Sequence, residues 1–239
     1  MSSDFSGKVV LVAGGTGGLG RAVSLAFLES GAQVAVTWRI EQEFLTLKDV
    51  ADESASRLAG FNVDVTDTQQ TADLAKQILS AWNRLDVLVN TVGGYAGGIP
   101  LWNLEPEVLE RMVSLNLLSG YALARAAVPQ MIARKSGAIV NVAAKAAWDH
   151  AAGASAYAAT KAAAVALMDS LAADLLGSGV RVNSILPSII DTAANRAAMP
   201  GADFSKWPKP EDIAKVVLFL SSDDACVIHG ASIPVFGNA

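Results

Sequence analysis

Short apolar runs alternate with longer amphipathic stretches along this chain. A run such as Lys8-Val-Val-Leu-Val-Ala13 is too short for a helix and is typical of a strand buried on both faces. We therefore predict an α/β fold with parallel strands over residues 8–13, 33–37, 59–65, 85–89, 138–142, 179–186 and 232–236. The amphipathic stretches predict helices over residues 21–30, 67–82, 105–134, 154–176 and 211–221, with a loop or short helix over 41–56.

The alternation runs from end to end without a linker, an internal repeat or a low-complexity segment. We therefore expect one domain over residues 1–239. The connection at residues 188–210 is long and carries large apolar residues, which is typical of a lid over a binding site. Hydrophobic residues make up 52% of the chain and charged ones 17%, which suits helices on both faces of a buried sheet.

Composition argues against several classes of function. The net charge is −5 and no cluster of Lys or Arg occurs, which disfavours nucleic acid as a partner. No apolar run is long enough to cross a bilayer, and no signal-peptide pattern follows Met1, so we expect a cytoplasmic location. Cys226 is the only cysteine, which excludes an internal disulfide, and its apolar context favours a structural role. With only His150 and His229 besides, no metal site is expected.

A glycine-rich loop, Gly14-Gly-Thr-Gly-Gly18-Leu-Gly20, follows the first predicted strand and precedes the first predicted helix. In that setting glycines allow close backbone approach, and the helix N-terminus offers free N–H groups to a pyrophosphate. A glycine-rich motif alone also fits a flexible loop, but its place after a buried strand favours a dinucleotide site. The residues expected to contact the cofactor here are Gly14, Thr16, Gly18, Leu19 and Gly20.

The end of the second predicted strand bears on the choice of cofactor. An NAD-selective enzyme usually has an acid there to bind the ribose hydroxyls, whereas this chain has Trp38-Arg39. Arg39 is expected to pair with a 2′-phosphate while the Trp38 indole covers the adenine. This arrangement favours NADP over NAD, and a surface arginine without a ligand is the alternative.

Two further strand ends complete the predicted cofactor site. Asp64, followed by Val65, is expected to accept a hydrogen bond from the adenine amino group. The turn from Asn90 to Gly98 is dense in glycine and includes Gly93. Such a turn at the carboxyl end of a central strand places backbone against a ligand at the switch point of the sheet.

The stretch Tyr157-Ala-Ala-Thr-Lys161 carries the candidate chemistry. It lies in an alanine-rich segment that predicts a helix, so a spacing of four puts the two side chains on one face. An ammonium about 4 Å away contributes about 4 kcal/mol at an effective dielectric near 20, enough to lower the phenol pKa by roughly three units. Tyr157 would then act as a general acid, although the pair alone also fits an ordinary helix. Asn116, amid apolar neighbours, is either a structural cross-brace or part of a polar relay.

Together these motifs resemble the short-chain dehydrogenase/reductase family, in the family's order and over nearly the whole chain. The resemblance implies a single-domain Rossmann fold with a seven-stranded parallel sheet, a nicotinamide cofactor and hydride transfer. It implies that Tyr157 donates a proton, that Lys161 tunes Tyr157 and holds the nicotinamide ribose, and that Asn116 anchors a water relay. Further cofactor contacts implied by the resemblance are Pro187, Ile190 and Thr192, the last against the carboxamide.

The chain departs from the family pattern at three positions. Most members have a serine thirteen residues before the tyrosine, where it binds the substrate carbonyl, and this chain has Ala144. Ala13 replaces the usual threonine before the glycine loop, and Ser188 replaces the usual glycine after the proline. Loss of an oxyanion hydrogen bond can cost about 3 kcal/mol, so a general carbonyl reductase should suffer from Ala144.

One branch of the family, quinonoid dihydropteridine reductase, does without that serine. The turn at residues 93–98, the stretch at 144–147 and the lid pattern MPGADFSKW at 199–207 are similar to segments of that branch. Hydride transfer to a conjugated imine-like ring forms no localised alkoxide, so an oxyanion donor is less necessary. The animal enzyme of the branch has an acid after its second strand and prefers NADH, unlike this chain. The expected substrate contacts are Tyr95, Ala144, Trp148, Met199 and Trp207, with ordinary packing as the alternative for each aromatic.

Three hypotheses of function remain open at this point. The first is an NAD(P)H-dependent reductase of a quinonoid dihydropterin, and the second is a reductase of another carbonyl or imine substrate, such as a 3-oxoacyl group. The third is an NAD(P)-binding interaction module without catalysis. The alanine-rich faces of the helices at 105–134 and 154–176 predict a homodimer or homotetramer that pairs through them, with a small-molecule substrate and no nucleic-acid or membrane partner.

Overall fold

Seven parallel strands form one sheet in the order β3-β2-β1-β4-β5-β6-β7. The computed structural model describes residues 4–238. Its strands are β1 (Val9–Ala13), β2 (Gln33–Trp38), β3 (Leu58–Asn62), β4 (Val87–Asn90), β5 (Gly137–Val142), β6 (Val180–Pro187) and β7 (Ser232–Val235). This is the strand order of a doubly wound dinucleotide-binding sheet, and it confirms the predicted fold.

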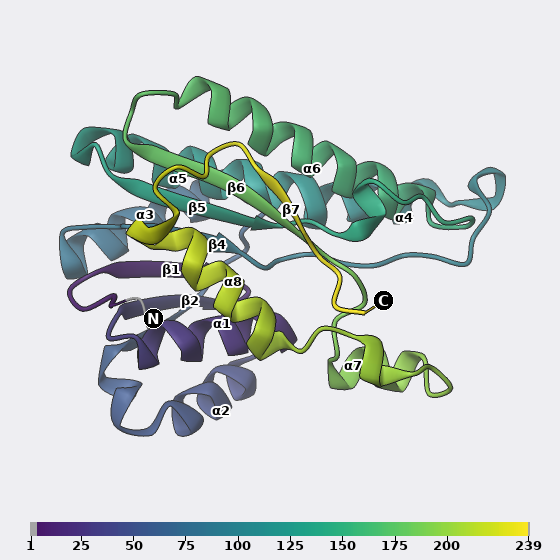
Figure 1. Ribbon diagram of the computed structural model, residues 1–239, viewed down its shortest axis with the longest axis horizontal. Coiled ribbons are helices and arrows are strands. Elements are labelled where there is room, and N and C mark those ends of the chain that lie inside the picture. The colour runs from purple at the N-terminus through teal and green to yellow at the C-terminus, as the bar shows by residue number, and fades with distance from the viewer. Residues whose placement is uncertain (1–3, 239) are drawn as a thin grey trace.

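Helices cover both faces of the sheet, because alternate residues of the central strands point to opposite sides. Val10 and Val12 of β1 pack with α1 (Gly18–Glu29) and α8 (Pro210–Ser221), whereas Val9 and Leu11 face the other layer. That second layer contains α3 (Thr68–Trp82), α5 (Ser119–Arg134) and α6 (Ser155–Asp174). In Figure 1, α5 and α6 lie above the sheet, and α1 and α2 (Glu41–Ala51) lie below it.

The predicted helix over 105–134 is not one regular helix. It consists of α4 (Pro106–Val113), a π-helical turn (Ser114–Leu118) and α5. The π-turn contains Asn116, whose buried side chain bonds to the backbone of Gly94. A π-turn inside an α-helix often marks a functional position, and here it directs a buried amide at the glycine-dense turn.

Local structure bears on three further expectations. Residues 41–56 form α2 and most of a 3-10 turn (Asp52–Arg57), which is the short-helix alternative of the prediction rather than the loop. The lid segment at 188–210 contains a short helix, α7 (Ala193–Ala198), and a 3-10 turn (Phe204–Lys206). The expected structural role of Cys226 is wrong, because its side chain is exposed. Among residues 4–238, no helix is long and apolar enough to cross a membrane.

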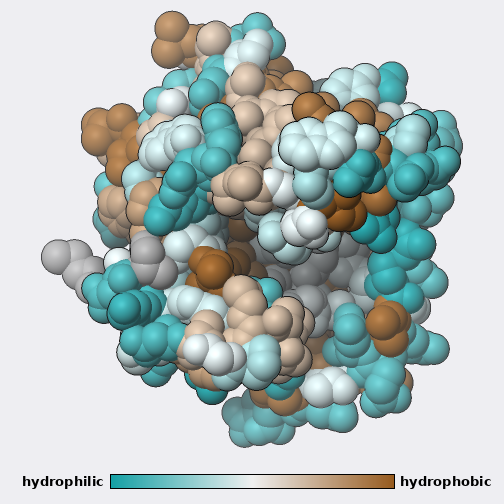
Figure 2. All heavy atoms as spheres, turned by 90° about the vertical axis from the view of Figure 1, so that its right-hand side faces the viewer, coloured by the Kyte–Doolittle hydropathy of each residue, from teal (hydrophilic) through white to brown (hydrophobic). Residues whose placement is uncertain are grey.

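The carboxyl ends of the strands lie on the right-hand side in Figure 1, next to α7 and the loop before α4. Figure 2 shows the same side of the molecule facing the viewer, and this face is hollowed at its centre. The glycine loop after β1, the turn after β4 and the segment after β6 all open toward this face. Ligands bind at this edge in open α/β sheets, so the site is built from these three connections.

Candidate active site

The glycine loop is shaped for close approach of a ligand. Gly14 has φ +72°, which favours glycine, and a Cβ added to Gly20 would overlap the carbonyl of Gly14. A Cβ on Gly18 would lie 2.8 Å from the Thr192 methyl group, so the loop also fits tightly against the segment after β6. No side chain caps the N-terminus of α1, which leaves the N–H groups of its first turn free. These features fit the pyrophosphate of a dinucleotide.

A cavity of about 260 Å³ continues from the glycine loop along the ends of β2, β3 and β4. It brings together six of the predicted cofactor residues, and Glu43 also lines it. Leu19 instead turns its side chain into the core, where it is 8% exposed. The six predicted residues in the cavity wall are Gly14, Thr16, Arg39, Asp64, Val65 and Gly93.

Two side chains expected to hold the adenosine half of the cofactor pair with each other. Arg39 Nη1 lies 2.9 Å from Asp64 Oδ2, and the Asp64 carboxylate also accepts from the Thr66 hydroxyl at 2.7 Å. Hydrogen bonds from Thr66, together with Arg39, hold the pKa of Asp64 below its ordinary value. The indole of Trp38 stacks on Phe44 at 6.1 Å between ring centroids. Arg39 and Asp64 must therefore move apart before either side chain can give its charge fully to a cofactor.

Asn116 ties the glycine-dense turn to the catalytic helix. Its Oδ1 accepts from the Gly94 N–H at 2.8 Å, and its Nδ2 donates to the Gly94 carbonyl and to Thr160 Oγ1, both at 3.1 Å. The Thr160 hydroxyl in turn lies 3.0 Å from the Tyr157 carbonyl. The structure therefore gives Asn116 the cross-brace role, and its part in a water relay stays a prediction. Sequence reasoning missed Thr160, although its place inside the Tyr-x-x-x-Lys motif was a usable signal.

Tyr157 and Lys161 lie on one face of α6, as their spacing predicts, but not in the expected pairing. Lys161 Nζ is 6.0 Å from the centroid of the Tyr157 ring and donates to the Val142 carbonyl at 3.0 Å. Burial lowers the pKa of Lys161 to about 8. Burial, and then the neighbouring Tyr95 phenol, raise the pKa of Tyr157 to about 12. The predicted lowering of the Tyr157 pKa is wrong in this structure, because desolvation outweighs an ammonium held elsewhere.

The substrate side of the site is lined by small and aromatic groups. Tyr95 packs edge-on against Tyr157, with 5.0 Å between ring centroids, and is 68% exposed. Trp148 is half-exposed, whereas Ala144 is buried. Trp207 is 7% exposed and packs on Phe204 within the lid, which leaves little of its ring for a flat substrate. Trp207 therefore has a packing role, which is the alternative stated above for each aromatic residue.

The remaining predicted residues hold the edges of the site. Asn90 accepts from the Val92 N–H at 3.1 Å and donates to Asn141 at 3.2 Å, so it shapes the turn after β4. Pro187 ends β6, and the Ile190 carbonyl accepts from Asn195 Nδ2 at 2.8 Å. Thr192 caps α7 through its hydroxyl. Met199 is partly exposed directly after α7.

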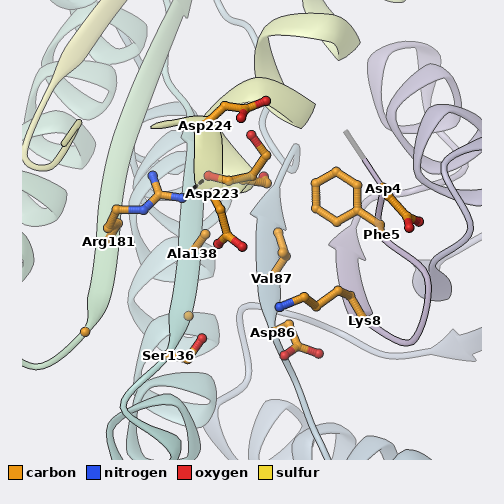
Figure 3. A pocket seen from close by; sticks show the side chains of 14 residues that line it. Asp4, Phe5, Lys8, Asp86, Val87, Ser136, Ala138, Arg181, Asp223 and Asp224 are labelled. Atoms are coloured by element: carbon orange, nitrogen blue, oxygen red, sulfur yellow. Dashed lines mark hydrogen bonds between the residues drawn. The ribbon is translucent and has the colours of Figure 1, made fainter. Parts of the chain in front are cut away.

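A second cavity, of about 250 Å³, lies at the opposite edge of the sheet and is drawn in Figure 3. Two of its charged groups, Asp86 and Arg181, hold backbone in place. Asp86 pairs with Arg84 at 2.7 Å and accepts from the Val9 N–H at 2.8 Å. Arg181 donates to the carbonyls of Leu220 and Ser222, both at 2.8 Å. These contacts join the amino ends of the strands to the end of α8, and none of the predicted site residues lies there.

Comparisons with known proteins agree with this geometry. A family model described as short chain dehydrogenase matches residues 8–202. The 3-oxoacyl-[acyl-carrier-protein] reductase FabG of Thermotoga maritima is 29% identical, over 97% of this chain and 97% of that protein. The 2-(S)-hydroxypropyl-CoM dehydrogenase 3 of Xanthobacter autotrophicus is 32% identical, over 99% of this chain and 98% of that protein. Among solved structures, ElxO with NADP bound has a TM-score of 0.91 at 26% identity, covering 96% of this chain and 97% of that chain.

The family expectation from the sequence is confirmed, and the narrower resemblance to the dihydropteridine reductase branch stays a prediction. The family model spans most of the chain, and the relative from Xanthobacter is similar over nearly its full length. The glycine loop and the Tyr157–Lys161 pair lie at one edge of a sheet with the expected strand order. The chain therefore belongs to the short-chain dehydrogenase/reductase family of NAD(P)-dependent oxidoreductases.

Proposed function

We propose that this protein reduces a small conjugated acceptor with NAD(P)H, and that a quinonoid dihydropterin is the best candidate substrate. The observation that carries the proposal is Ala144, a buried methyl group where a carbonyl reductase needs a hydroxyl. The exposed Tyr95 and Trp148 rings support a flat substrate, because aromatic faces stack on planar rings. The similarity of the lid sequence at 199–207 to the pteridine branch supports the same substrate class.

The bound nicotinamide would supply the hydride. Tyr157 would supply the proton: its pKa of about 12 keeps the phenol protonated at neutral pH, so the proton is available to the substrate. Lys161, whose pKa is about 8, remains mostly charged at neutral pH and would stabilise the phenolate left after transfer. Asn116 would keep the glycine-dense turn at a fixed distance from α6 while substrate and cofactor exchange.

Adding the missing hydroxyl tests the substrate class directly. Ala144→Ser is expected to raise kcat/KM for a ketone substrate by about tenfold or more, because an oxyanion hydrogen bond is worth a few kcal/mol. It should change kcat/KM for chemically generated quinonoid dihydropterin by less than about threefold, because no alkoxide forms there. The measurement is the initial rate at which the reduced cofactor is oxidised, followed by its absorbance, after the uncatalysed rate with the pterin has been subtracted. A wild-type pterin rate no faster than that background would end the proposal.

A second candidate function is reduction of a 3-oxoacyl substrate. It is favoured by the similarity to the FabG reductase of Thermotoga maritima over nearly the whole chain. Ala144 weighs against it, because a 3-oxo group becomes a localised alkoxide when hydride arrives. Turnover of a 3-oxoacyl thioester by the wild-type protein far above turnover of the pterin would make this the better assignment.

We propose that the reductant is either NADPH or NADH. Arg39 is the cation available for a 2′-phosphate. To make that contact, Arg39 must either leave Asp64, which lies 2.9 Å away, or bind Asp64 and the phosphate together. The adenosine group of either cofactor would lie in the cavity of about 260 Å³ along the ends of β2 and β3.

The assembly we propose is a homodimer or homotetramer that pairs through α5 and α6. A groove of about 270 Å³ runs between these helices and has a largely apolar wall. The large apolar side chains in that wall favour a protein partner, because a contiguous apolar surface is costly to leave in water. Light scattering at micromolar concentration should give twice or four times the 24.7 kDa chain mass, and Leu171→Glu should lower it. A wild-type mass equal to one chain would contradict the assembly. The groove residues are Tyr121, Ala124, Arg125, Val128, Pro129, Leu167, Ser170, Leu171 and Asp174.

A further inference from the structure

A carboxylate outside the end of β2 reaches into the adenosine cavity. Glu43, in the first turn of α2, accepts from the Thr16 hydroxyl of the glycine loop at 3.0 Å. Thr16 and Glu43 line the same cavity as Arg39 and Asp64. The bond links two segments that are distant in sequence, across the space where the ribose end of a dinucleotide enters.

The position of Glu43 is set by the packing of the residue beside it. Phe44 lies over Gly60 of β3, where an added Cβ would overlap its ring, and it stacks nearly parallel on Trp38 at an interplanar angle of 12°. Gly60 therefore lets the start of α2 lie close to the sheet. Because Phe44 is held in this way, the backbone of Glu43 lies where its exposed side chain can reach Thr16.

The charges in the cavity oppose a phosphate more than the Trp38-Arg39 sequence suggests. Its wall carries one guanidinium, from Arg39, and two carboxylates, from Glu43 and Asp64. Arg39 is already paired with Asp64, and the Thr16 hydroxyl is already engaged by Glu43. A 2′-phosphate would bring about −1.5 to −2 charge beside Glu43, whereas free ribose hydroxyls would meet a carboxylate acceptor.

We propose that Glu43 is a cofactor-selecting residue that favours the free ribose hydroxyls of NADH and disfavours the 2′-phosphate of NADPH, against the opposite influence of Arg39. The inference rests on NAD(P) binding in this cavity, as in the proposed function, and not on the identity of the substrate. Cofactor choice then depends on two side chains of opposite charge, only one of which follows directly after β2.

The test is the dissociation constant for each reduced cofactor, measured by titration calorimetry on the full chain without substrate. Glu43→Gln is expected to tighten NADPH binding by about fivefold or more, because a like charge beside the phosphate is removed. NADH binding should stay within twofold or weaken. The gain for NADPH should shrink as salt is raised, since the site is exposed.

Glu41→Gln is the matched control, because Glu41 lies in the same helical turn and lacks the bond to Thr16. It should move either dissociation constant by less than twofold. Arg39→Gln should act in the opposite direction to Glu43→Gln and weaken NADPH more than NADH. Equal shifts for both cofactors in Glu43→Gln, no shift, or the same gain in Glu41→Gln would overturn the proposal. Absence of pterin turnover would overturn the proposed function but leave these binding results intact.

Discussion

Replacing Tyr157 by Phe is expected to lower kcat by about 10²–10⁴-fold, whichever substrate proves correct. The substitution keeps the ring that packs edge-on against Tyr95 and removes only the hydroxyl that we propose as the proton donor. Affinity for NAD(P)H should stay within about twofold, because the phenol does not line the cavity that we propose for the adenosine half. Steady-state turnover and calorimetric binding of the cofactor measure the two effects separately.

Tyr95→Phe is the control for this experiment. Tyr95 carries the same phenol in contact with the same ring, but it is 68% exposed and lies on the glycine-dense turn. Its loss of a hydroxyl should change kcat by only a few-fold. A Tyr157→Phe protein that keeps more than a tenth of wild-type turnover would show that another group donates the proton.

Lys161→Met is expected to abolish measurable turnover and to stabilise the fold at neutral pH. Lys161 is 5% exposed, and burial lowers its pKa from 10.5 to about 8. The unfolded chain therefore binds more protons than the folded one between these two values, and the free energy of unfolding rises with pH across this window. Below pH 8 the full cost of the buried charge is present, about 3 kcal/mol, and methionine removes it.

Urea unfolding at several pH values measures this effect. The stability advantage of Lys161→Met over wild type should be largest at pH 7 and should shrink between pH 8 and pH 10.5. Lys145→Met is a suitable control, since Lys145 lies on the same side of the site but its side chain is 38% exposed. An advantage that does not change with pH would show that packing of the methionine, and not the buried charge, is responsible.

The cost of burying Lys161 is consistent with a functional reason for its charge. Its Nζ is fixed by the Val142 carbonyl, and a Cβ on Gly93 would lie 3.0 Å from it. Glycine at position 93 therefore allows the turn after β4 to approach the ammonium. The proposed catalytic role of Tyr157 would account for this loss of stability, because folds commonly give up stability where they support an active site.

Much of the fold could be predicted because buried parallel strands require continuous apolar residues. The run before Gly14 is one example, and its strand begins and ends within one residue of the prediction. The Asp67 side chain caps α3, and such a local cap needs only residues close in sequence. The π-turn at Asn116 could not be predicted in this way, because the side chain that it presents bonds to the backbone of Gly94, on another segment.

The candidate site likewise combines features that are local in sequence with features that depend on the tertiary structure. Tyr157 and Lys161 lie on one helix face because four residues make about one turn, and the glycine loop lies at a helix N-terminus because it joins a strand to a helix. The pairing of Arg39 with Asp64, by contrast, depends on β2 and β3 being neighbours in the sheet. The link between Thr16 and Glu43 depends on how Phe44 fits over Gly60.

The sequence by itself therefore determined the fold class, the family and the positions of the candidate catalytic groups along the chain, since these follow from local periodicity and from the spacing of short motifs. Only the tertiary structure decided the protonation of Tyr157 and the charge balance around the cofactor cavity. Electrostatic energies depend on burial and on distances across the fold, and residues far apart in sequence set both.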